Sequence, residues 1–365
     1  MDRSDLISLM QAVGEPPYRA QQILEAVYRQ RVDSIEEIST IPLQLRSKLR
    51  EMAFEVGFPN IEKRFLSKDG TVRYLVGFPD GQSVETVWMP EGDGGETGDG
   101  TEAGESTPDN VRRWDRATIC ISSQVGCAVD CQFCLTALLG VKRNLTPGEI
   151  VGQVCAVIED QNVSPPQDRI NLVFMGMGEP FLNYENFMKS VRLLAGEVGI
   201  AESRMTVSTA GIVPRVYDFG KESVRPKLAI SLNASNNEIR DSLMPINRKW
   251  NLEKLIAAAR EFPLRNRERI TFEYVLMNGV NDELKNAREV VELIRGLRAK
   301  VNLIALNPGP GIQFSTPSMD RVLAFQQVLI QAGIPAFVRR PRGRDIYAAC
   351  GQLKRTVEIA TAPGL

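Results

Sequence analysis

The chain has 365 residues, of which 43% are apolar and 24% are charged. These proportions are ordinary for a soluble globular protein, and the length allows one large domain or two to three smaller ones. No apolar run is long enough to span a bilayer, and the acidic residues among the first five positions do not resemble a secretion signal. An integral membrane protein is therefore excluded, and we expect a cytoplasmic protein with no membrane partner.

The net charge of −1 conceals an uneven distribution of charge. Residues 91–110 contain seven acidic and no basic residues, so the rest of the chain has 38 acidic against 44 basic residues. A mildly basic body permits a polyanionic partner without requiring one. The acidic stretch lacks aromatic and large apolar side chains and cannot bury much surface, so we predict a disordered loop there.

The first part of the chain is predicted to contain two small regions. Residues 1–55 have amphipathic helical patterns rich in Lys and Arg, whose basic face either is solvated or contacts RNA. Residues 56–115 form a small β region, with strands at Glu62–Ser67, Thr71–Val76 and Ser83–Met89 and the disordered loop 91–110. We therefore expect an N-terminal helical accessory domain followed by a short antiparallel segment.

Strand and helix patterns alternate through residues 116–340. The expected strands are Ala117–Ser122, Ile170–Phe174, Met205–Ser208, Leu228–Leu232, Ile270–Leu276, Val301–Leu306 and Ala336–Arg339. The expected helices are Pro147–Asp160, Tyr184–Leu194, Asn236–Leu243, Leu252–Glu261, Glu283–Leu297 and Ser318–Ala332. Repeated β–α units predict an α/β fold with a parallel sheet, closed or nearly so, and a site at the carboxyl ends of its strands.

Three cysteines form a compact C-x3-C-x2-C motif at Cys127, Cys131 and Cys134. Tetrahedral zinc usually draws two close pairs of ligands and often histidine, and this chain has no histidine. An iron–sulfur cluster with three thiolate ligands and one open iron fits the spacing better. The alternative is a structural zinc site that borrows Cys120 or Cys350 as its fourth ligand.

The motif, with Phe133 just before its last cysteine, resembles the signature of the radical S-adenosylmethionine (SAM) enzymes. The resemblance implies a partial, TIM-like (βα)6 barrel with the cluster loop after the first strand. It also implies that the open iron chelates the amino and carboxylate groups of SAM.

Small polar groups stand at four of the predicted strand ends, in Met175–Pro180, Thr206–Gly211, Ala229–Ala234 and Asn302–Pro308. Such groups suit a ribose or adenine pocket, although each could serve turn or capping chemistry alone. Glu179 supplies an acceptor for an ammonium group, and its stretch resembles the "GGE-like" motif that binds the SAM amino group.

Three further residues carry possible chemistry. Cys350 lies near the basic run 339–344, which would favour its thiolate, unless it is an inert buried thiol. Glu85 lies in an apolar strand that can raise the pKa of a carboxylate, although most strand carboxylates face water. Cys155 lies among apolar helix residues and is interpreted as core.

Longer stretches resemble the RlmN family of radical SAM enzymes, which methylate C2 of an adenine in 23S ribosomal RNA and, in some bacteria, in tRNA. They are Arg116–Cys127, Met175–Pro180 and Ala348–Leu353, and the likeness covers nearly the whole chain. It includes a tail (341–365) whose cysteine, Cys350, is a methyl acceptor by that resemblance. The resemblance implies that Cys127, Cys131 and Cys134 bind one [4Fe–4S] cluster. It implies a SAM site formed by Gly178, Glu179, Ser208, Ser231, Leu232, Asn233 and Asn307.

The resemblance also implies three catalytic residues and two SAM molecules per turnover. Cys350 would accept a methyl group from the first SAM, and a radical from the second would activate that methyl for addition to adenine. Glu85 would remove the ring proton, and Cys120 would attack Cys350 to release the product and leave a disulfide. The implied partners are 23S rRNA, tRNA in some members, an electron donor such as flavodoxin or ferredoxin, and a thiol reductant for the Cys120–Cys350 disulfide, with the enzyme a monomer.

The chain departs from the family pattern in two places. It has Asn233 where the family usually has histidine, and the acidic loop 91–110 is longer than usual. Two alternative functions remain. One is methylation of adenine C8, as in related ribosomal resistance enzymes, and the other is a non-catalytic, zinc-stabilised RNA-binding protein.

Overall fold

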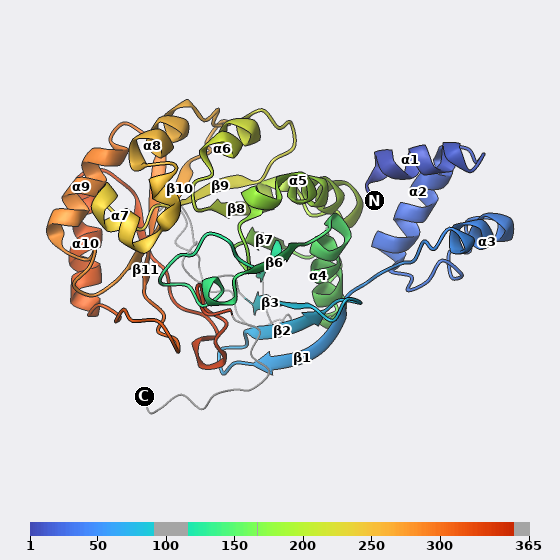
Figure 1. The fold of residues 1–365 in the computed structure, drawn as a ribbon, viewed down its shortest axis with the longest axis horizontal. Helices are drawn as coiled ribbons and strands as arrows, with labels where there is room; N and C mark the ends of the chain where they lie inside the picture. The colour runs from blue at the N-terminus through green and yellow to red at the C-terminus, as the bar shows by residue number, and fades with distance from the viewer. Residues whose placement is uncertain (91–115, 166, 354–365) are drawn as a thin grey trace.

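The structure is a computed structural model that describes residues 1–90, 116–165 and 167–353. The acidic stretch predicted to be a disordered loop, and the last twelve residues of the tail, lie outside the described residues. Figure 1 shows a curved central sheet with helices outside it and three N-terminal helices to one side.

The central sheet has ten strands in the order β1-β2-β3-β4-β7-β8-β9-β10-β11-β12. From β4 onward all neighbours are parallel, whereas β1–β2, β2–β3 and β3–β4 pair antiparallel. The strands of the parallel part are β4 (Ala117–Cys120), β7 (Ile170–Phe174), β8 (Met205–Thr209), β9 (Lys227–Ser231), β10 (Ile270–Leu276), β11 (Ala299–Ala305) and β12 (Ala336–Val338).

Helices connect successive parallel strands and cover the outer face of the sheet (Figure 1). They are α4 (Pro147–Asp160), α5 (Tyr184–Leu193), α6 (Val213–Gly220), α7 (Asn237–Leu243), α8 (Leu252–Glu261), α9 (Leu284–Ile294) and α10 (Met319–Gln331). The six strand–helix units from β4 to α10 confirm the predicted α/β radical SAM fold. Within the described ranges, none of the helices combines the length and apolarity needed to cross a bilayer.

The predicted boundaries are accurate where the pattern is strong. β7, β10, α4 and α8 begin and end at the predicted residues. The prediction missed α6, because Pro214 reads as a helix breaker although proline is tolerated in the first turn of a helix. The first strand ends at Cys120, two residues early, because Ser122 leaves the sheet to bond its Oγ to the Glu85 carbonyl at 2.7 Å.

The antiparallel strands extend the same sheet instead of forming a separate layer. β1 (Asn60–Leu66), β2 (Val72–Gly77) and β3 (Ser83–Pro90) join the barrel through β3 and β4, in a register that pairs Val87 with Cys120. Side chains alternate along a strand, so Glu85, two residues from Val87, shares the inward face with Cys120. One continuous sheet therefore crosses the predicted boundary at residues 115 and 116.

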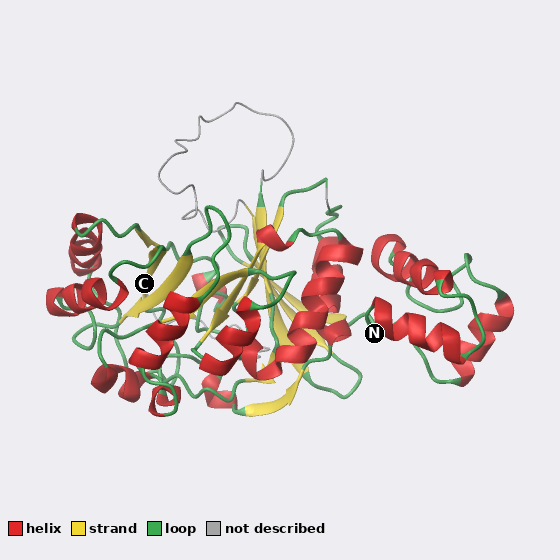
Figure 2. Cartoon of the chain, turned by 90° about the horizontal axis from the view of Figure 1, so that it is seen from above, coloured by secondary structure: helices red, strands yellow, loops and turns green. Residues whose placement is uncertain are grey.

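The N-terminal helices α1 (Arg3–Ala12), α2 (Tyr18–Glu25) and α3 (Leu43–Glu51) stand beside this body in both views (Figures 1 and 2). Polar contacts tie them to it. Arg3 pairs with Glu197 at 2.7 Å, and Lys189 pairs with Asp5 at 2.9 Å. Glu197 follows α5, and Lys189 lies in α5. The N-terminal helices therefore dock on the outer helical layer and leave the barrel interior unobstructed.

We predict opposite effects for two alanine substitutions in α4. A Cβ at Gly152 would lie 2.4 Å from Cδ of Pro59, in the segment that leads from α3 to β1, whereas a Cβ at Gly148 would meet nothing within 4 Å. Gly152→Ala should therefore lower the free energy of unfolding by about 1–3 kcal/mol through overpacking. Gly148→Ala, the matched control, should be neutral or stabilising by up to about 1 kcal/mol. Chemical unfolding measures both, and an unchanged stability of Gly152→Ala would contradict the packing described here.

Candidate functional site

The motif cysteines lie in a loop, residues 127–140, between two short strands. β5 (Gln124–Gly126) and β6 (Val141–Asn144) form a hairpin that the sequence pattern did not predict. Gly126 has φ +81°, and a Cβ there would lie 1.7 Å from the Gly140 carbonyl oxygen, so only glycine closes this hairpin. The Cys127 amide then donates to that carbonyl at 3.1 Å, which places the first cysteine at the loop entrance.

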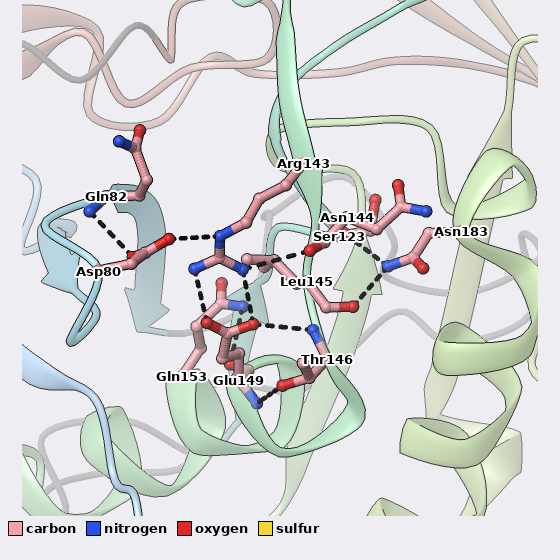
Figure 3. Close-up of polar contacts among 10 residues, drawn as sticks. All are labelled: Asp80, Gln82, Ser123, Arg143, Asn144, Leu145, Thr146, Glu149, Gln153 and Asn183. Carbon is pink, nitrogen blue, oxygen red and sulfur yellow. Dashed lines mark hydrogen bonds and ion pairs between the residues drawn. The ribbon is translucent and has the colours of Figure 1, made fainter.

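Arg143 anchors the base of this hairpin, as Figure 3 shows. Its guanidinium donates to both carboxylate oxygens of Glu149, at 2.9 and 2.7 Å, and its Nε donates to Asp80 at 2.6 Å. Glu149 is held in place by the predicted capping box with Thr146 at the start of α4. The Arg143 side chain therefore ties β6 to the carboxylate of Glu149 in α4 and to that of Asp80, which lies between β2 and β3.

Buried amides hold the other side of the hairpin. The Asn183 side chain donates to the carbonyls of Ser123 and Leu145 at 2.8 and 2.7 Å, which bridges the two strands (Figure 3). Gln153 of α4 accepts from the Ser122 amide at 2.9 Å and donates to its carbonyl at 3.0 Å. These contacts satisfy the backbone groups that leave the sheet after β4.

Cys127, Cys131 and Cys134 all line one cavity of about 160 Å³ at the carboxyl ends of the strands. In the described part of the chain, no three His, Cys, Asp or Glu side chains converge on a single ion position. Burial raises the pKa of Cys127 to about 12, so metal binding to this thiol must displace a proton.

Glu179 lines the same cavity as the motif cysteines. Its carboxylate accepts from the amides of Ala210 at 2.7 Å and Phe181 at 3.0 Å. Its own amide donates to Gln124 at 2.9 Å. Burial raises the pKa of Glu179 to about 7, although these hydrogen bonds oppose the shift. A buried carboxylate of this kind favours a cationic or hydrogen-bond-donating ligand.

The backbone before Glu179 approaches its neighbours too closely for side chains. A Cβ at Gly176 would lie 2.7 Å from the Ile121 carbonyl oxygen, and Gly178 has φ +95° with Gln124 atoms 2.6–2.8 Å from its Cβ position. Both glycines line the cavity. Close approach thus requires glycine at both positions, and backbone conformation requires it at Gly178 as well.

Residues of β8 and β9 complete the cavity wall. Ser208 and Ser231 both line it, with their hydroxyl oxygens 3.2 Å apart. Asn233 also lines it, in the left-handed conformation (φ +55°) that asparagine tolerates, and its Oδ1 accepts from the Val275 amide at 2.8 Å. Leu232 instead packs in the main hydrophobic core and does not line the cavity, so the structure does not place it with the other predicted SAM-site residues.

Arg240 is a site residue that sequence analysis missed. It is fully buried, and it donates to the carbonyls of Leu232 at 3.1 Å, Ala210 at 2.7 Å and Ser231 at 3.1 Å. Burial lowers the pKa of Arg240 to about 10. Arg240 lies in the middle of α7, and an arginine in so short and polar a helix gave little sign that it points inward.

The tail carries Cys350 onto the cluster loop. The Leu135 amide donates to the Gly351 carbonyl at 2.8 Å, and the Thr136 hydroxyl donates to the Leu353 carbonyl at 2.7 Å. Asn307 donates to the Cys350 carbonyl at 3.3 Å. Cys350 is exposed and lines both the cysteine cavity and a second cavity of about 70 Å³.

Cys120 and Asn307 line this second cavity with Cys350. Burial, together with the charge of Cys350, raises the pKa of the Cys120 thiol. Asn307 therefore lies beside Cys350 instead of in the cavity of Glu179, where the resemblance had placed it with the SAM ligands. Cys155 is buried in the core, as interpreted from its helix pattern.

Glu85 is separated from the other predicted catalytic residues. Its carboxylate is fully buried and forms an ion pair with the fully buried Arg73 on the neighbouring strand. Neither cavity is lined by Glu85. Its backbone lies close to the site, because its amide donates to the sulfur of Met177 at 3.4 Å.

Comparisons with known proteins agree with this geometry. Residues 121–291 match the model of the radical SAM superfamily, and residues 1–54 match that of the ribosomal RNA large subunit methyltransferase N-terminal domain. A radical SAM methyltransferase from Sphaerobacter thermophilus has the same fold, with a TM-score of 0.84 and 41% identity over 97% of this chain and 98% of that chain. The chain is therefore a radical SAM enzyme.

Relatives that match over nearly their whole length define the family. The probable dual-specificity RNA methyltransferase RlmN of Koribacter versatilis is 67% identical over 96% of this chain and 99% of its own length. The dual-specificity RNA methyltransferase RlmN of Nitratiruptor sp. is 44% identical over 93% of each chain. The chain belongs to the RlmN family of SAM-dependent RNA methyltransferases, which confirms the predicted membership.

Membership implies SAM and a [4Fe–4S] cluster, and the residues of the cavity fit both. Three cysteines on a short loop supply the donor set of a cluster with one open iron. Glycines that leave no room for a Cβ, and a buried carboxylate in the same cavity as the cysteines, suit a ligand with an amino group.

We predict that Arg143→Ala loosens the loop 127–140. The substitution removes the contacts to Glu149 and Asp80 that hold β6, so hydrogen exchange in the loop should accelerate, and iron bound after anaerobic reconstitution should fall. Lys142→Ala, an exposed neighbour on the same strand, is the control and should match the wild type. Equal exchange and iron content in both variants would show that Arg143 does not anchor the loop.

We predict that Glu179 makes the protein without cluster or SAM less stable as pH rises. The pKa of about 7 in the folded state exceeds the ordinary 4.5. Between these two pH values the carboxyl group therefore ionises in the unfolded chain but stays protonated in the folded protein. The resulting decrease in the free energy of unfolding is complete above pH 7 and amounts to about 3 kcal/mol. The melting temperature of Glu179→Gln relative to wild type should therefore rise between pH 5 and pH 8. Glu51→Gln, an exposed control, should show no such trend, and a pH-independent difference for Glu179→Gln would refute the shift.

Proposed function

We propose that this chain methylates C2 of an adenine in 23S rRNA, and of an adenine in tRNA as a second substrate, through a methyl group carried on Cys350. The observation that supports this proposal most directly is the position of Cys350. It lines the cavity of the three motif cysteines and Glu179, and also the cavity of Cys120. The related sequences are named as dual-specificity RNA methyltransferases, which supports RNA as the substrate class.

In this proposal the described residues divide into two binding sets. Cys127, Cys131 and Cys134 hold a [4Fe–4S] cluster, and Gly178, Glu179, Ser208, Ser231 and Asn233 hold SAM. When bound, these groups supply one-electron chemistry that activates a methyl carbon, which is needed because the electrophilic C2 of adenine cannot be methylated by displacement. Two SAM molecules are used per turnover, and a flavodoxin or ferredoxin supplies the electron.

Two further cysteines, Cys350 and Cys120, carry and release the methyl carbon. Cys350 is exposed in the tail and is available to accept a methyl group, with Asn307 holding its carbonyl. Burial raises the pKa of the Cys120 thiol, so its proton must be removed before it can act as a nucleophile. Cys120 then attacks the sulfur of Cys350. The bond from that sulfur to carbon breaks with its electron pair on the carbon, which takes up a proton to become the methyl group, and a disulfide remains for a thiol reductant.

Glu85 is the proposed base that removes the ring proton. In this structure its carboxylate is paired with Arg73, so it can act only after Arg73 moves or after the tail shifts toward β3. The inward register of Glu85, on the same face as Cys120, supports this assignment.

We predict a methyl group on Cys350 in protein purified without air, detected by peptide mass analysis. Cys120→Ala should retain that methyl and also hold RNA covalently, because the attack that releases the product is lost. Cys155→Ala, a buried thiol outside both cavities, is the control and should release RNA normally.

An unmodified Cys350 in every variant, with iron and SAM bound, would refute the methyl-carrier mechanism. Nucleoside mass spectrometry of the RNA product separates methylation at C2 from methylation at C8. A C8 product would retain the roles of the cysteines and replace the proposed regiochemistry.

A further inference from the structure

Cys350 lies in a segment with little regular structure of its own. In the part of the tail that the structure describes, residues 341–353, regular structure is limited to a 3-10 helix of three residues, Arg344–Ile346. The sulfur of Cys350 must nevertheless serve two cavities, and a reacting atom displaced by about 1 Å can slow a reaction about a hundredfold. The contacts that hold this segment in place therefore matter for its chemistry.

Residues 343–348 form a compact turn, which we call the tail turn. The Gly343 carbonyl accepts from the amide of Ala348 at 2.8 Å and from that of Ile346 at 3.2 Å. Gly343 and Tyr347 both have the left-handed conformation, with φ +59° and +54°. Cys350 follows the turn by two residues, which span at most about 7 Å. The position of the tail turn therefore limits the position of the Cys350 sulfur.

The tail turn is bound to the turn between β1 and β2, residues 67–71, which we call the hairpin turn. Asp345 of the tail turn accepts from the Ser67 hydroxyl at 2.5 Å and from the Lys68 amide at 3.2 Å. Asp69 of the hairpin turn accepts from the Gly343 amide at 3.0 Å. Each turn thus supplies one carboxylate that accepts hydrogen bonds from the other turn. Reciprocal contacts of this kind fix both the separation and the orientation of the two segments.

Close packing accompanies these hydrogen bonds. A Cβ at Gly343 would lie 2.7 Å from the Cβ of Ala348 and 2.9 Å from Cγ2 of Thr71, so a larger residue does not fit between the two turns. Ser67 and Thr71 are buried. Partial burial raises the pKa of Asp69, but hydrogen bonds from Gly343 and Thr71 outweigh this effect and lower the pKa. Asp69 is therefore ionised at neutral pH, which strengthens the hydrogen bond that it accepts from the tail.

A second attachment lies on the other side of Cys350. The amide of Leu135 and the hydroxyl of Thr136, both in the cluster loop, donate to tail carbonyls that follow Cys350. Cys350 is therefore held between the hairpin turn before it and the cluster loop after it. The hairpin turn joins β1 and β2, which are hydrogen-bonded through β3 to β4. This attachment consequently fixes Cys350 relative to the sheet that carries Cys120.

We propose that Ser67 and Asp345 are positioning residues for Cys350, and that their contact fixes its sulfur between the cavity of the motif cysteines and the cavity of Cys120. This inference rests on the proposed function and adds residues that act through the tail backbone without touching SAM or RNA. It also gives β1 and β2 a role in the reaction, since the turn that joins them holds the tail.

The test compares Ser67→Ala and Asp345→Ala with the control Lys68→Ala, which removes an exposed side chain of the hairpin turn and keeps the amide that donates to Asp345. The holoenzyme is reconstituted without air from chains whose Cys350 is unmethylated, and transfer of a labelled methyl group from SAM to Cys350 is followed by peptide mass analysis. Both test variants should transfer the methyl group at least about tenfold more slowly than the control, because the sulfur is displaced. Their iron content and their dissociation constant for SAM should match the control, a split between rate and binding that general instability would not produce.

Two further measurements strengthen the test. Asp345→Asn retains a side-chain oxygen that can accept from the Ser67 hydroxyl, so it should recover most of the lost rate. Hydrogen exchange reports on the attachment without any SAM chemistry. In Ser67→Ala, exchange at residues 343–350 should be faster than in Lys68→Ala, whereas exchange in the loop 127–140 should be the same in both.

Two results would overturn the inference. In one, Ser67→Ala and Asp345→Ala match Lys68→Ala in both methyl transfer and hydrogen exchange. In the other, slower transfer is accompanied by an equal loss of bound iron or SAM, which would show damage to the whole site instead of a displaced Cys350. Failure of the proposed function is distinguishable, because Cys350 of the wild type would then accept no methyl group, while exchange at residues 343–350 would still show whether the hairpin turn holds the tail.

Discussion

The buried guanidinium of Arg240 is the interaction on which the carboxyl end of the barrel depends. It satisfies three backbone carbonyls from the ends of β8 and β9, where the chain turns away from the sheet and loses its ladder hydrogen bonds. A buried carbonyl without a partner costs about 1–3 kcal/mol. The Arg240 side chain thus stabilises the ends of β8 and β9 where they leave the sheet. Ser231 and Asn233, at the end of β9, line the cavity there as part of its wall.

Around that wall, the site combines parts from distant regions of the chain. Glycines 176 and 178 bring backbone against the β4–β5 turn, Arg143 and Asn183 hold the hairpin, and the tail returns to place Cys350 beside Cys120. The contacts that position the reactive groups are mostly between side chains and backbone. Such contacts hold loops at defined positions where no sheet or helix ladder is available.

The fold and most of the cavity were predictable from sequence, for physical reasons. Period-two and period-3.6 patterns located β7, β10, α4 and α8 to the residue, and parallel strands bring their carboxyl ends to one edge. Hence Glu179, Ser208, Ser231 and the three motif cysteines were expected together and do line one cavity. Local patterns do not show where a side chain points beyond a strand end, nor which side chain of another element it meets. The inward turn of Arg240, the burial of Leu232 and the pairing of Glu85 with Arg73 therefore emerged only in the folded structure.

The contacts between the cluster loop and the tail have a consequence for damage by oxygen. Leu135 and Thr136 hold the tail by hydrogen bonds from the same loop that carries the motif cysteines. Oxidative damage to the motif cysteines would act on this loop directly, and these two hydrogen bonds would transmit the damage to the segment that positions Cys350.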